Sequence, residues 1–218
     1  MRPCSIQANG VARSKSSARW LKEHFDDPYV KRAQAEGWRS RAVFKLEELL
    51  ERDRLLKPGM VVVDLGAAPG GWSQMIRERL GDAVRIVALD ILPMQGISGV
   101  EFIEGDFRDE AVVQRLEATL GGVKPDLVLS DMAPNMSGVN EVDQARAMDL
   151  AELAQEFARV HLKPGGAFLA KVIQGGTESA LLAALKRDFS TVKHVKPAAS
   201  RADSAELYVL ATGFRGVR

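Results

Sequence analysis

Cysteine is almost missing from this 218-residue chain, since Cys4 is the only one. One cysteine excludes an intrachain disulfide, and nothing in the sequence points to an oxidising compartment. Long apolar runs are missing as well: no stretch approaches the ~20 residues that a membrane span needs, and the N-terminus has no apolar signal-peptide core. We therefore expect a cytoplasmic protein that does not insert into a membrane.

Net charge is also small, at +1, but it is spread unevenly. Residues 1–45 hold ten Lys/Arg against four Asp/Glu, and the remainder holds twenty against twenty-five. Aromatic residues interleave with the cations of this basic N-terminal arm, which we bound at residues 1–39, and that pattern favours a nucleic-acid partner. We predict RNA contacts at Arg32, Arg39 and Arg41, with a solvated tail or helix face as the alternative.

The rest of the composition is ordinary for a soluble globular protein, with 46% hydrophobic and 27% charged residues. The length suffices for one sizeable α/β core and no second full domain, and we assign residues 40–218 to that core. No dedicated metal-binding cluster is evident, so we expect no metal site.

The most informative stretch is residues 60–72, MVVVDLGAAPGGW. Its first four residues form a short apolar, β-branched run, which is typical of a parallel strand covered on both faces. Gly66, Gly70 and Gly71 follow, and glycines there permit positive φ and let a ligand approach the backbone. The helix that begins next would offer free N–H groups to that ligand.

The second glycine of the dinucleotide pattern G-x-G-x-x-G is missing, because the turn reads GAAPGG over residues 66–71. Its absence disfavours a pyrophosphate, and with it a nicotinamide dehydrogenase, and favours a nucleoside that carries an amino-acid tail. The stretch resembles the first motif of the Rossmann-like methyltransferases, which implies S-adenosylmethionine as the cofactor. An ordinary strand–turn–helix connection is the alternative.

Strands and helices alternate along the chain, which predicts an α/β fold with a mostly parallel sheet and helices on both faces. The expected strands are 60–63, 83–90, 99–104, 126–130, 167–173, 192–195 and 206–211. The expected helices are 18–36 (broken near Asp27-Pro28), 40–54 (capped by Ser40), 72–80, 110–120, 143–162 and 178–189.

Lys171 interrupts an apolar strand that should be buried, and a buried lysine needs a partner. Asp131 ends the preceding strand, so both side chains lie at the carboxyl edge of the sheet if those strands are neighbours. The connection 196–205 is too short for a helical crossover, so the last strand should run antiparallel and begin at the same edge, with Glu206. A structural ion-pair network is the alternative for this trio.

These residues suit methyl transfer to a ribose hydroxyl, a poor nucleophile that must lose its proton. A lysine with a lowered pKa, or one that orients the hydroxyl, would serve, and the carboxylates would hold its head in place. Lys45 could be a second cation beside it. The simpler interpretation of Lys45 is a solvent-facing side chain that pairs with Glu48 on the same helix.

Two further acids follow the second and third expected strands. Asp90 lies about twenty-four residues past Gly66, near the spacing at which an acidic residue binds ribose hydroxyls. Asp106 sits where a loop could reach an adenine. Either residue could instead cap a helix or a turn.

Five segments together resemble the FtsJ-type ribosomal RNA ribose 2′-O-methyltransferases: SRAVFKL, VVVDLGAAPGGWSQ, GDFRDE, SDMAPNMSG and SAELYVLATG. The resemblance runs from about Ser17 onward, with AKVIQGG in place of a phenylalanine-containing KVFQG and a longer leader as departures. It implies a catalytic tetrad at Lys45, Asp131, Lys171 and Glu206, with Lys171 as the proton acceptor. It implies cofactor contacts at Gly70, Trp72, Asp90, Asp106 and Asp131.

The resemblance also implies a Rossmann-like S-adenosylmethionine-dependent fold with a seven-stranded sheet and one antiparallel strand. The implied reaction is 2′-O-methylation of a uridine in the A-loop region of 23S rRNA, on the assembled large (50S) ribosomal subunit. We expect the enzyme to act as a monomer.

Other classes fit the residues less well. A base N-methyltransferase should carry an Asn-Pro-Pro-Tyr-like loop, where this chain has Asp-Met-Ala-Pro at 131–134. A cytosine C5-methyltransferase needs a cysteine nucleophile, and Cys4 in the arm cannot supply it. A non-catalytic ribosome-assembly factor that keeps the cofactor fold would not need Lys171 in a buried strand.

Overall fold

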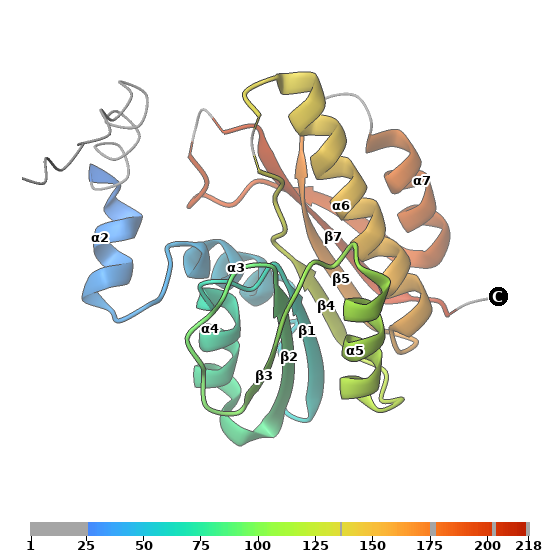
Figure 1. The fold of residues 1–218 in the computed structure, drawn as a ribbon, viewed down its shortest axis with the longest axis horizontal. Helices are drawn as coiled ribbons and strands as arrows, with labels where there is room; N and C mark the ends of the chain where they lie inside the picture. Colours follow the sequence, from blue (N-terminus) through green and yellow to red (C-terminus); the bar gives the residue numbers. More distant parts are fainter. Residues whose placement is uncertain (1–25, 136, 175–177, 202–203, 217–218) are drawn as a thin grey trace, which may run out of the picture.

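The computed structural model describes residues 26–135, 137–174, 178–201 and 204–216, and within them seven strands form one sheet (Figure 1). The strands are β1 (Met60–Leu65), β2 (Val84–Asp90), β3 (Val100–Glu104), β4 (Leu127–Ser130), β5 (Ala167–Ile173), β6 (Phe189–Val195) and β7 (Glu206–Phe214). The helices are α2 (Pro28–Ala35), α3 (Ala42–Arg52), α4 (Gly71–Leu80), α5 (Glu110–Leu120), α6 (Asn140–His161) and α7 (Glu178–Asp188), with a 3-10 turn over Gly81–Ala83.

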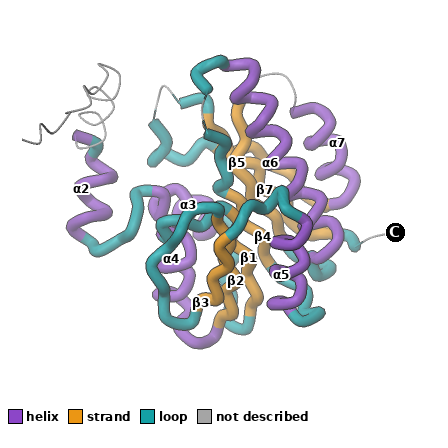
Figure 2. Tube along the Cα trace, viewed as in Figure 1, coloured by secondary structure: helices purple, strands orange, loops and turns teal. Residues whose placement is uncertain are grey.

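The strand order is β3-β2-β1-β4-β5-β7-β6. Strands β1 to β5 pair in parallel, and β7 runs antiparallel to both of its neighbours, β5 and β6. The predicted α/β sheet of seven strands with one antiparallel strand is therefore confirmed. Figure 2 shows the strands gathered in one layer, with helices and loops around them.

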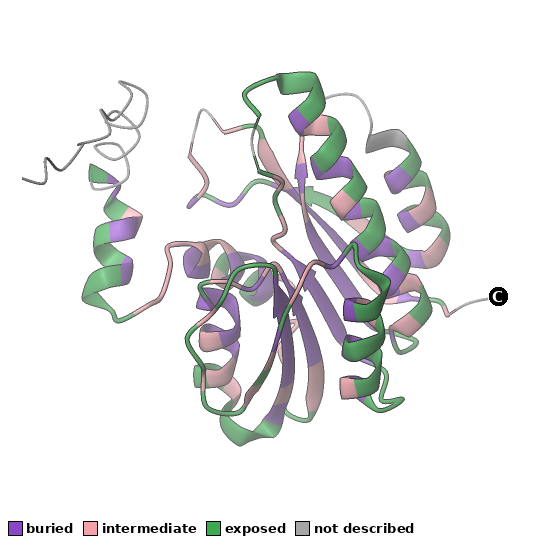
Figure 3. Ribbon diagram, in the orientation of Figure 1, coloured by how far each residue is buried: buried purple, intermediate pink, exposed green. Residues whose placement is uncertain are grey.

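Helices cover both faces of this sheet, as predicted. One buried cluster joins the sheet to α5, α6 and α7, and a second joins it to α3 and α4. Figure 3 shows the consequence: the central strands are buried, and the exposed residues lie on the outer sides of the helices. Burial on both faces explains why β1 reads as a continuous apolar run rather than an alternating one.

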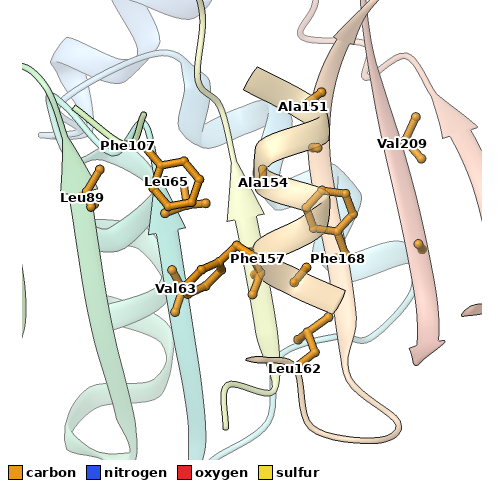
Figure 4. Close-up of a cluster of buried hydrophobic side chains, with 14 of the residues drawn as sticks. Val63, Leu65, Leu89, Phe107, Ala151, Ala154, Phe157, Leu162, Phe168 and Val209 are labelled. Carbon is orange, nitrogen blue, oxygen red and sulfur yellow. The ribbon is translucent and has the colours of Figure 1, made fainter. Parts of the chain in front are cut away.

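Aromatic rings fill the space under α6 (Figure 4). Phe157 of α6 meets Phe107 edge-on, with ring centroids 5.8 Å apart. The ring centroids of Phe168 of β5 and Phe189 of β6 lie 6.5 Å apart, and both side chains belong to the same buried cluster as Val209 of β7. Fully burying a side chain of this size stabilises the fold by roughly 1.5–3 kcal/mol, so this cluster anchors the strands that carry the charged edge described below.

The start of α3 differs from the sequence expectation of a helix from Ser40 to about Arg54. The helix begins at Ala42 and ends at Arg52, and no side chain caps its first turn. The carbonyl of Ser40, rather than its hydroxyl, receives a hydrogen bond, from the N–H of Val43 at 3.4 Å. The hydroxyl lies instead against the first turn of α4, where a Cβ added to Gly71 would be 2.5 Å from Ser40 Oγ.

The last two strands are longer than the sequence predicted. Phe189 was assigned to the preceding helix, but it begins β6 and pairs with Phe214 at the end of β7. Their rings lie 5.2 Å apart in the core. A tertiary contact thus overrides the local helix pattern. Two elements, α5 and β5, have the predicted bounds, and most of the other ends differ by one to three residues.

The arm contributes one described helix, α2, which stands at the left in Figure 1 and contacts α3 through side chains. Asp27 caps it by accepting from the N–H of Tyr29 at 2.9 Å, and Tyr29 packs against Phe44 of α3 with centroids 5.7 Å apart. The predicted break at Asp27-Pro28 is therefore the start of a helix. Trp20 and Phe25, two aromatic residues that we expected to anchor the arm to the core, lie outside the described residues.

Candidate active site

The glycine turn after β1 leads directly into α4. Gly70 is the N-cap, with φ +104, and as a glycine it supplies no side-chain cap to the N–H groups of the first turn. Gly66 lies close to the loop after β4, because a Cβ at Gly66 would be 2.6 Å from the backbone nitrogen of Met132. Both glycines are required by backbone geometry, and the turn has the form of an anion-binding helix start.

Trp72 contributes to this turn through its main chain. Its indole Nε1 donates to the carbonyl of Ala42 at 2.8 Å, and its ring lies 5.9 Å from that of Tyr208. The side chain is 4% exposed and belongs to the core under α3 and α4. Of the predicted cofactor contact at Trp72, only the backbone N–H in the first turn of α4 remains available to a ligand.

Asp90 and Asp106 both hold turns. Asp90, at the end of β2, accepts from the N–H groups of Ala68 and Leu92, each at 2.8 Å, so it braces the glycine turn. Asp106 accepts from the N–H of Arg108 at 2.9 Å and forms an ion pair with its guanidinium at 2.6 Å. The capping alternative is seen for both residues, and these contacts leave the predicted cofactor contacts untested.

Asp64 is a fully buried acid that sequence reasoning did not single out. Its Oδ2 accepts from the hydroxyl of Ser73 at 2.7 Å, while Oδ1 has no hydrogen-bond partner within the described residues. Burial raises the pKa of Asp64 to about 7, and the charges of Asp131 and Asp90 add to the rise while Ser73 opposes it. The sequence did offer a signal for Asp64, since it is an acidic residue within an apolar strand, two positions before the first glycine of the turn.

Lys171 and Asp131 form the first of two charged pairs at the carboxyl edge of the sheet, on the side of β4, β5 and β7. Their strands, β5 and β4, are neighbours as the argument required. Lys171 Nζ lies 3.1 Å from Asp131 Oδ1 and donates to the Asp131 carbonyl at 2.7 Å. The N–H of Asp131 donates to Leu65 of β1 at 2.9 Å, so this residue is held from both sides.

Lys45 and Glu206 form the second pair. Lys45 Nζ lies 2.9 Å from Glu206 Oε2, although the two residues are 161 positions apart in the sequence. The alternative pairing of Lys45 with Glu48 is wrong, because Glu48 accepts instead from the N–H of Ala198 at 2.7 Å. The tertiary contact between Lys45 and Glu206 thus replaces the pair that spacing along the helix suggested.

Tyr208 joins the two pairs. It lies directly opposite Lys171 in the β5–β7 register, two residues beyond Glu206 and therefore on the same face of β7. Its hydroxyl donates to Asp131 Oδ1 at 2.9 Å, and Lys45 Nζ lies 5.7 Å from its ring centroid. Sequence reasoning missed Tyr208, although period-two alternation from Glu206 would have found it.

The pairs are partly withdrawn from water. The side chains of Lys45 and Lys171 are 12% and 11% exposed. Burial alone would raise the pKa of Glu206, but Lys45, then Lys171 and Arg41, outweigh it and hold that pKa below its ordinary value. Burial, followed by the charge of Asp131, raises the pKa of Tyr208 well above its ordinary value.

The arrangement brings all four predicted tetrad residues to one edge of the sheet. Lys171 donates one hydrogen bond, to the carbonyl of Asp131, and forms an ion pair with its carboxylate, so among the described residues its nitrogen keeps a position for another molecule. A neutral amine held in this way can accept a proton, and an ammonium can orient an oxygen. A measurement of turnover distinguishes this role from that of a structural ion-pair network, which would have the same contacts.

The described part of the chain contains no group of three or more His, Cys, Asp or Glu side chains placed to hold a metal ion. Among the same residues, no helix is both long enough and apolar enough to cross a membrane.

Comparisons with known proteins point to one family. The model of the FtsJ-like methyltransferase family matches residues 38–214. Curated relatives from Xanthomonas euvesicatoria pv. vesicatoria and Xanthomonas oryzae pv. oryzae are both named Ribosomal RNA large subunit methyltransferase E. Each is 65% identical to this chain over 204 residues, which cover 94% of this chain and 97% of the relative.

Solved structures agree. A protein from Plasmodium falciparum whose structure is described as that of a ribosomal RNA methyltransferase superposes with a TM-score of 0.74 at 29% identity, over 83% of this chain and all of that one. A structure from Clostridium thermocellum, at 17% identity, 77% coverage of this chain, 96% of its own and a TM-score of 0.53, shares the fold.

Proposed function

Because this chain belongs to the FtsJ-like methyltransferase family, we propose that it methylates the 2′-oxygen of a uridine ribose in large-subunit ribosomal RNA. The observation that carries the proposal is Lys171, which an ion pair and a hydrogen bond to Asp131 hold at the carboxyl edge of the sheet. The names of the curated relatives support large-subunit rRNA as the substrate. We further propose a uridine of the A-loop region, on the assembled subunit, and a monomeric cytoplasmic enzyme.

The residues around the glycine turn fit S-adenosylmethionine. That molecule carries a carboxylate, which suits the uncapped N-terminus of α4 at Gly70 and Trp72, and an ammonium, which suits a carboxylate such as the unpartnered Oδ1 of Asp64. Asp90 and Asp106 end or follow neighbouring strands at the same edge, and we propose that they contact its ribose and adenine. When bound, it supplies an electrophilic methyl group on a sulfonium.

The tetrad would prepare the acceptor. Lys171 would take the proton of the ribose hydroxyl as that oxygen is methylated. Asp131 fixes Lys171 Nζ through its carboxylate and its carbonyl, so the amine is positioned before the substrate arrives. Lys45, fixed by Glu206, adds a cation that steadies negative charge on the ribose oxygen.

The test uses ribosomal subunits from a strain that lacks this enzyme. The purified protein is incubated with large subunits, small subunits or protein-free rRNA, together with S-adenosylmethionine labelled in the methyl group, and the label is mapped by nucleoside mass spectrometry. We expect one 2′-O-methyluridine, in the large subunit alone. Label on a base, or no label from a protein that binds the cofactor, would overturn the proposal.

A further inference from the structure

Arg39 lies in the connection between α2 and α3, among the cations that the sequence assigned to RNA (Figure 1). That connection is fixed to α4, the helix that follows the glycine turn. The Arg39 N–H donates to Gln74 Oε1 of α4 at 3.0 Å, and Gln74 Nε2 donates back to the carbonyl of Gly37 at 3.1 Å. These main-chain contacts hold Arg39 beside the glycine turn, independently of the contacts of its side chain.

The guanidinium of Arg39 binds backbone carbonyls on two different loops. It donates to Pro69, in the glycine turn, at 3.2 Å. It also donates to Gly96 at 2.8 Å and to Gln95, both in the loop that follows Asp90. Within the described residues all its side-chain partners are carbonyls, so its donors are spent on the fold rather than on an acidic side chain.

The glycine turn and the loop after β2 lie next to each other at the N-terminus of α4. The glycine turn presents the N-terminus of α4, and the loop after β2 begins at Asp90, which itself holds Ala68 of the turn. Gly70 is covered by that loop: a Cβ there would be 2.8 Å from Met94 Sδ, 2.9 Å from Ile97 Cδ1 and 3.2 Å from Arg39 Cδ. Arg39 thus bridges the two segments at the point where they close around the turn.

We propose that Arg39 is a positioning residue for the cofactor, which holds the glycine turn and the loop over residues 91–98 at the separation that S-adenosylmethionine requires. This inference rests on the proposed function, in that it takes the bound nucleoside to be that molecule. The planar guanidinium of Arg39 can donate to several carbonyls at once, whereas a lysine ammonium on a flexible side chain would hold them less well. Arg39 is accordingly not a contact to RNA phosphates.

Arg32 supplies the matched comparison, because it is another arginine of the arm with a different environment. Its side chain is 53% exposed, pairs with Glu36 at 2.6 Å and lies over Phe44 of α3. None of these contacts involves the glycine turn or the loop after β2. Arg32 can therefore meet a phosphate without disturbing either loop.

The experiment compares Arg39→Gln, Arg39→Lys and Arg32→Gln in the full-length protein. Calorimetry measures the Kd of S-adenosylmethionine, and filter binding measures how the affinity for protein-free large-subunit rRNA falls with salt. We expect Arg39→Gln to weaken cofactor binding at least tenfold, Arg39→Lys to fall between it and the wild type, and Arg32→Gln to stay within twofold. We expect the salt slope to fall by about one for Arg32→Gln and to stay unchanged for Arg39→Gln.

Hydrogen–deuterium exchange of the cofactor-free protein gives a readout that needs neither ligand nor catalysis. Arg39→Gln should speed exchange in residues 91–98 and in the glycine turn, while exchange in α5 stays as in the wild type. If the wild type bound no S-adenosylmethionine, the proposed cofactor would be wrong, and the exchange data alone would decide the role of Arg39. Unchanged exchange there, or an unchanged Kd together with a reduced salt slope for Arg39→Gln, would overturn the inference.

Discussion

Around β1 and β2 the carboxyl edge of the sheet presents main-chain groups braced by carboxylates, whereas around β4, β5 and β7 it presents charged side chains that hold one another. In the first half, Asp90 accepts two backbone N–H groups and Gly70 leaves a helix start uncapped. In the second half, Lys171 meets Asp131 and Lys45 meets Glu206. The first arrangement suits binding, and the second suits moving a proton.

The two halves also differ in how far apart their parts lie in the sequence. The glycine turn, Asp64 and Asp90 fall within one strand–turn–helix–strand segment of the chain. The second half needs α3, β4, β5 and β7 together, and its Lys45–Glu206 pair spans 161 positions. Substitutions should therefore separate the halves: those in the second half should affect transfer, and those in the first should affect cofactor binding and stability.

The largest effect should come from Lys171→Ala. Removing the proposed proton acceptor should lower methyl transfer by roughly 10²–10⁴-fold, the usual contribution of general acid–base catalysis. The Kd of S-adenosylmethionine should stay within twofold, since Lys171 lies in the other half of the edge. Single-turnover transfer and calorimetry measure the two quantities. Lys163→Ala, an exposed lysine paired with Asp126, is the control; normal turnover in Lys171→Ala would remove it from the mechanism.

The next effect concerns the support of the charged half. Asp27 is 7% exposed and pairs with Arg41, which also donates to the carbonyl of Ala199 in the connection to β7, while Arg201 Nε lies 3.5 Å from Asp27. Asp27→Asn keeps a good helix cap but removes the charge, and should lower the free energy of unfolding by about 3 kcal/mol, measured in urea.

Asp109→Asn is the matched control for that variant. Asp109 caps α5 by accepting from the N–H of Ala111 at 2.9 Å and is exposed. Its replacement should change the free energy of unfolding by less than about 0.5 kcal/mol. Equal losses in the Asp27 and Asp109 variants would show that only the caps matter and that the buried pair adds nothing.

Asp64 gives a prediction for the binding half. With a folded pKa of about 7, the folded protein retains a proton that an unfolded chain releases near pH 4, so the stabilisation is present at low pH and is lost as pH rises through 7. Between pH 5.5 and 8 the cofactor-free protein should lose about 2 kcal/mol from this group. Asp64→Asn should remove that part of the slope in urea denaturation; an unchanged slope would assign it to other groups.

The smallest effect should come from Tyr208→Phe, which deletes the hydroxyl that donates to Asp131 and leaves the buried ring in place. Loss of one hydrogen bond to a charged group should slow transfer about tenfold. The Tm should change little, and cofactor affinity should not change. A tenfold loss of cofactor affinity in this variant would break the distinction between the two halves.

Most of the fold could be read from the sequence because its signals are local. The apolar run at β1, the glycine turn and the alternation of strands with helices each predict their element from neighbouring residues. The short connection 196–205 even predicted the direction of β7. The errors fall where a distant contact decides, as at Phe189, which joins β6 because it packs against Phe214.

The candidate site divides in the same way. Lys171 could be singled out because a lysine in a buried strand demands a partner, and Asp131 because it ends the neighbouring strand. The partner of Lys45 could not be found by local rules, which favoured Glu48. The carbonyl partners of Arg39 could not be found either, since a cation-rich arm predicts phosphate contacts and says nothing of carbonyls on two remote loops.

The sequence by itself determined the α/β class, the glycine turn with its uncapped helix start, and the demand for a partner at Lys171. Those properties follow from side-chain size, backbone freedom and the cost of burying a charge, which act on single residues and their neighbours. The tertiary structure alone decided which charges pair, as Lys45 with Glu206 and Arg41 with Asp27. A pairing depends on distance in space, and only the packed sheet and helices set that distance.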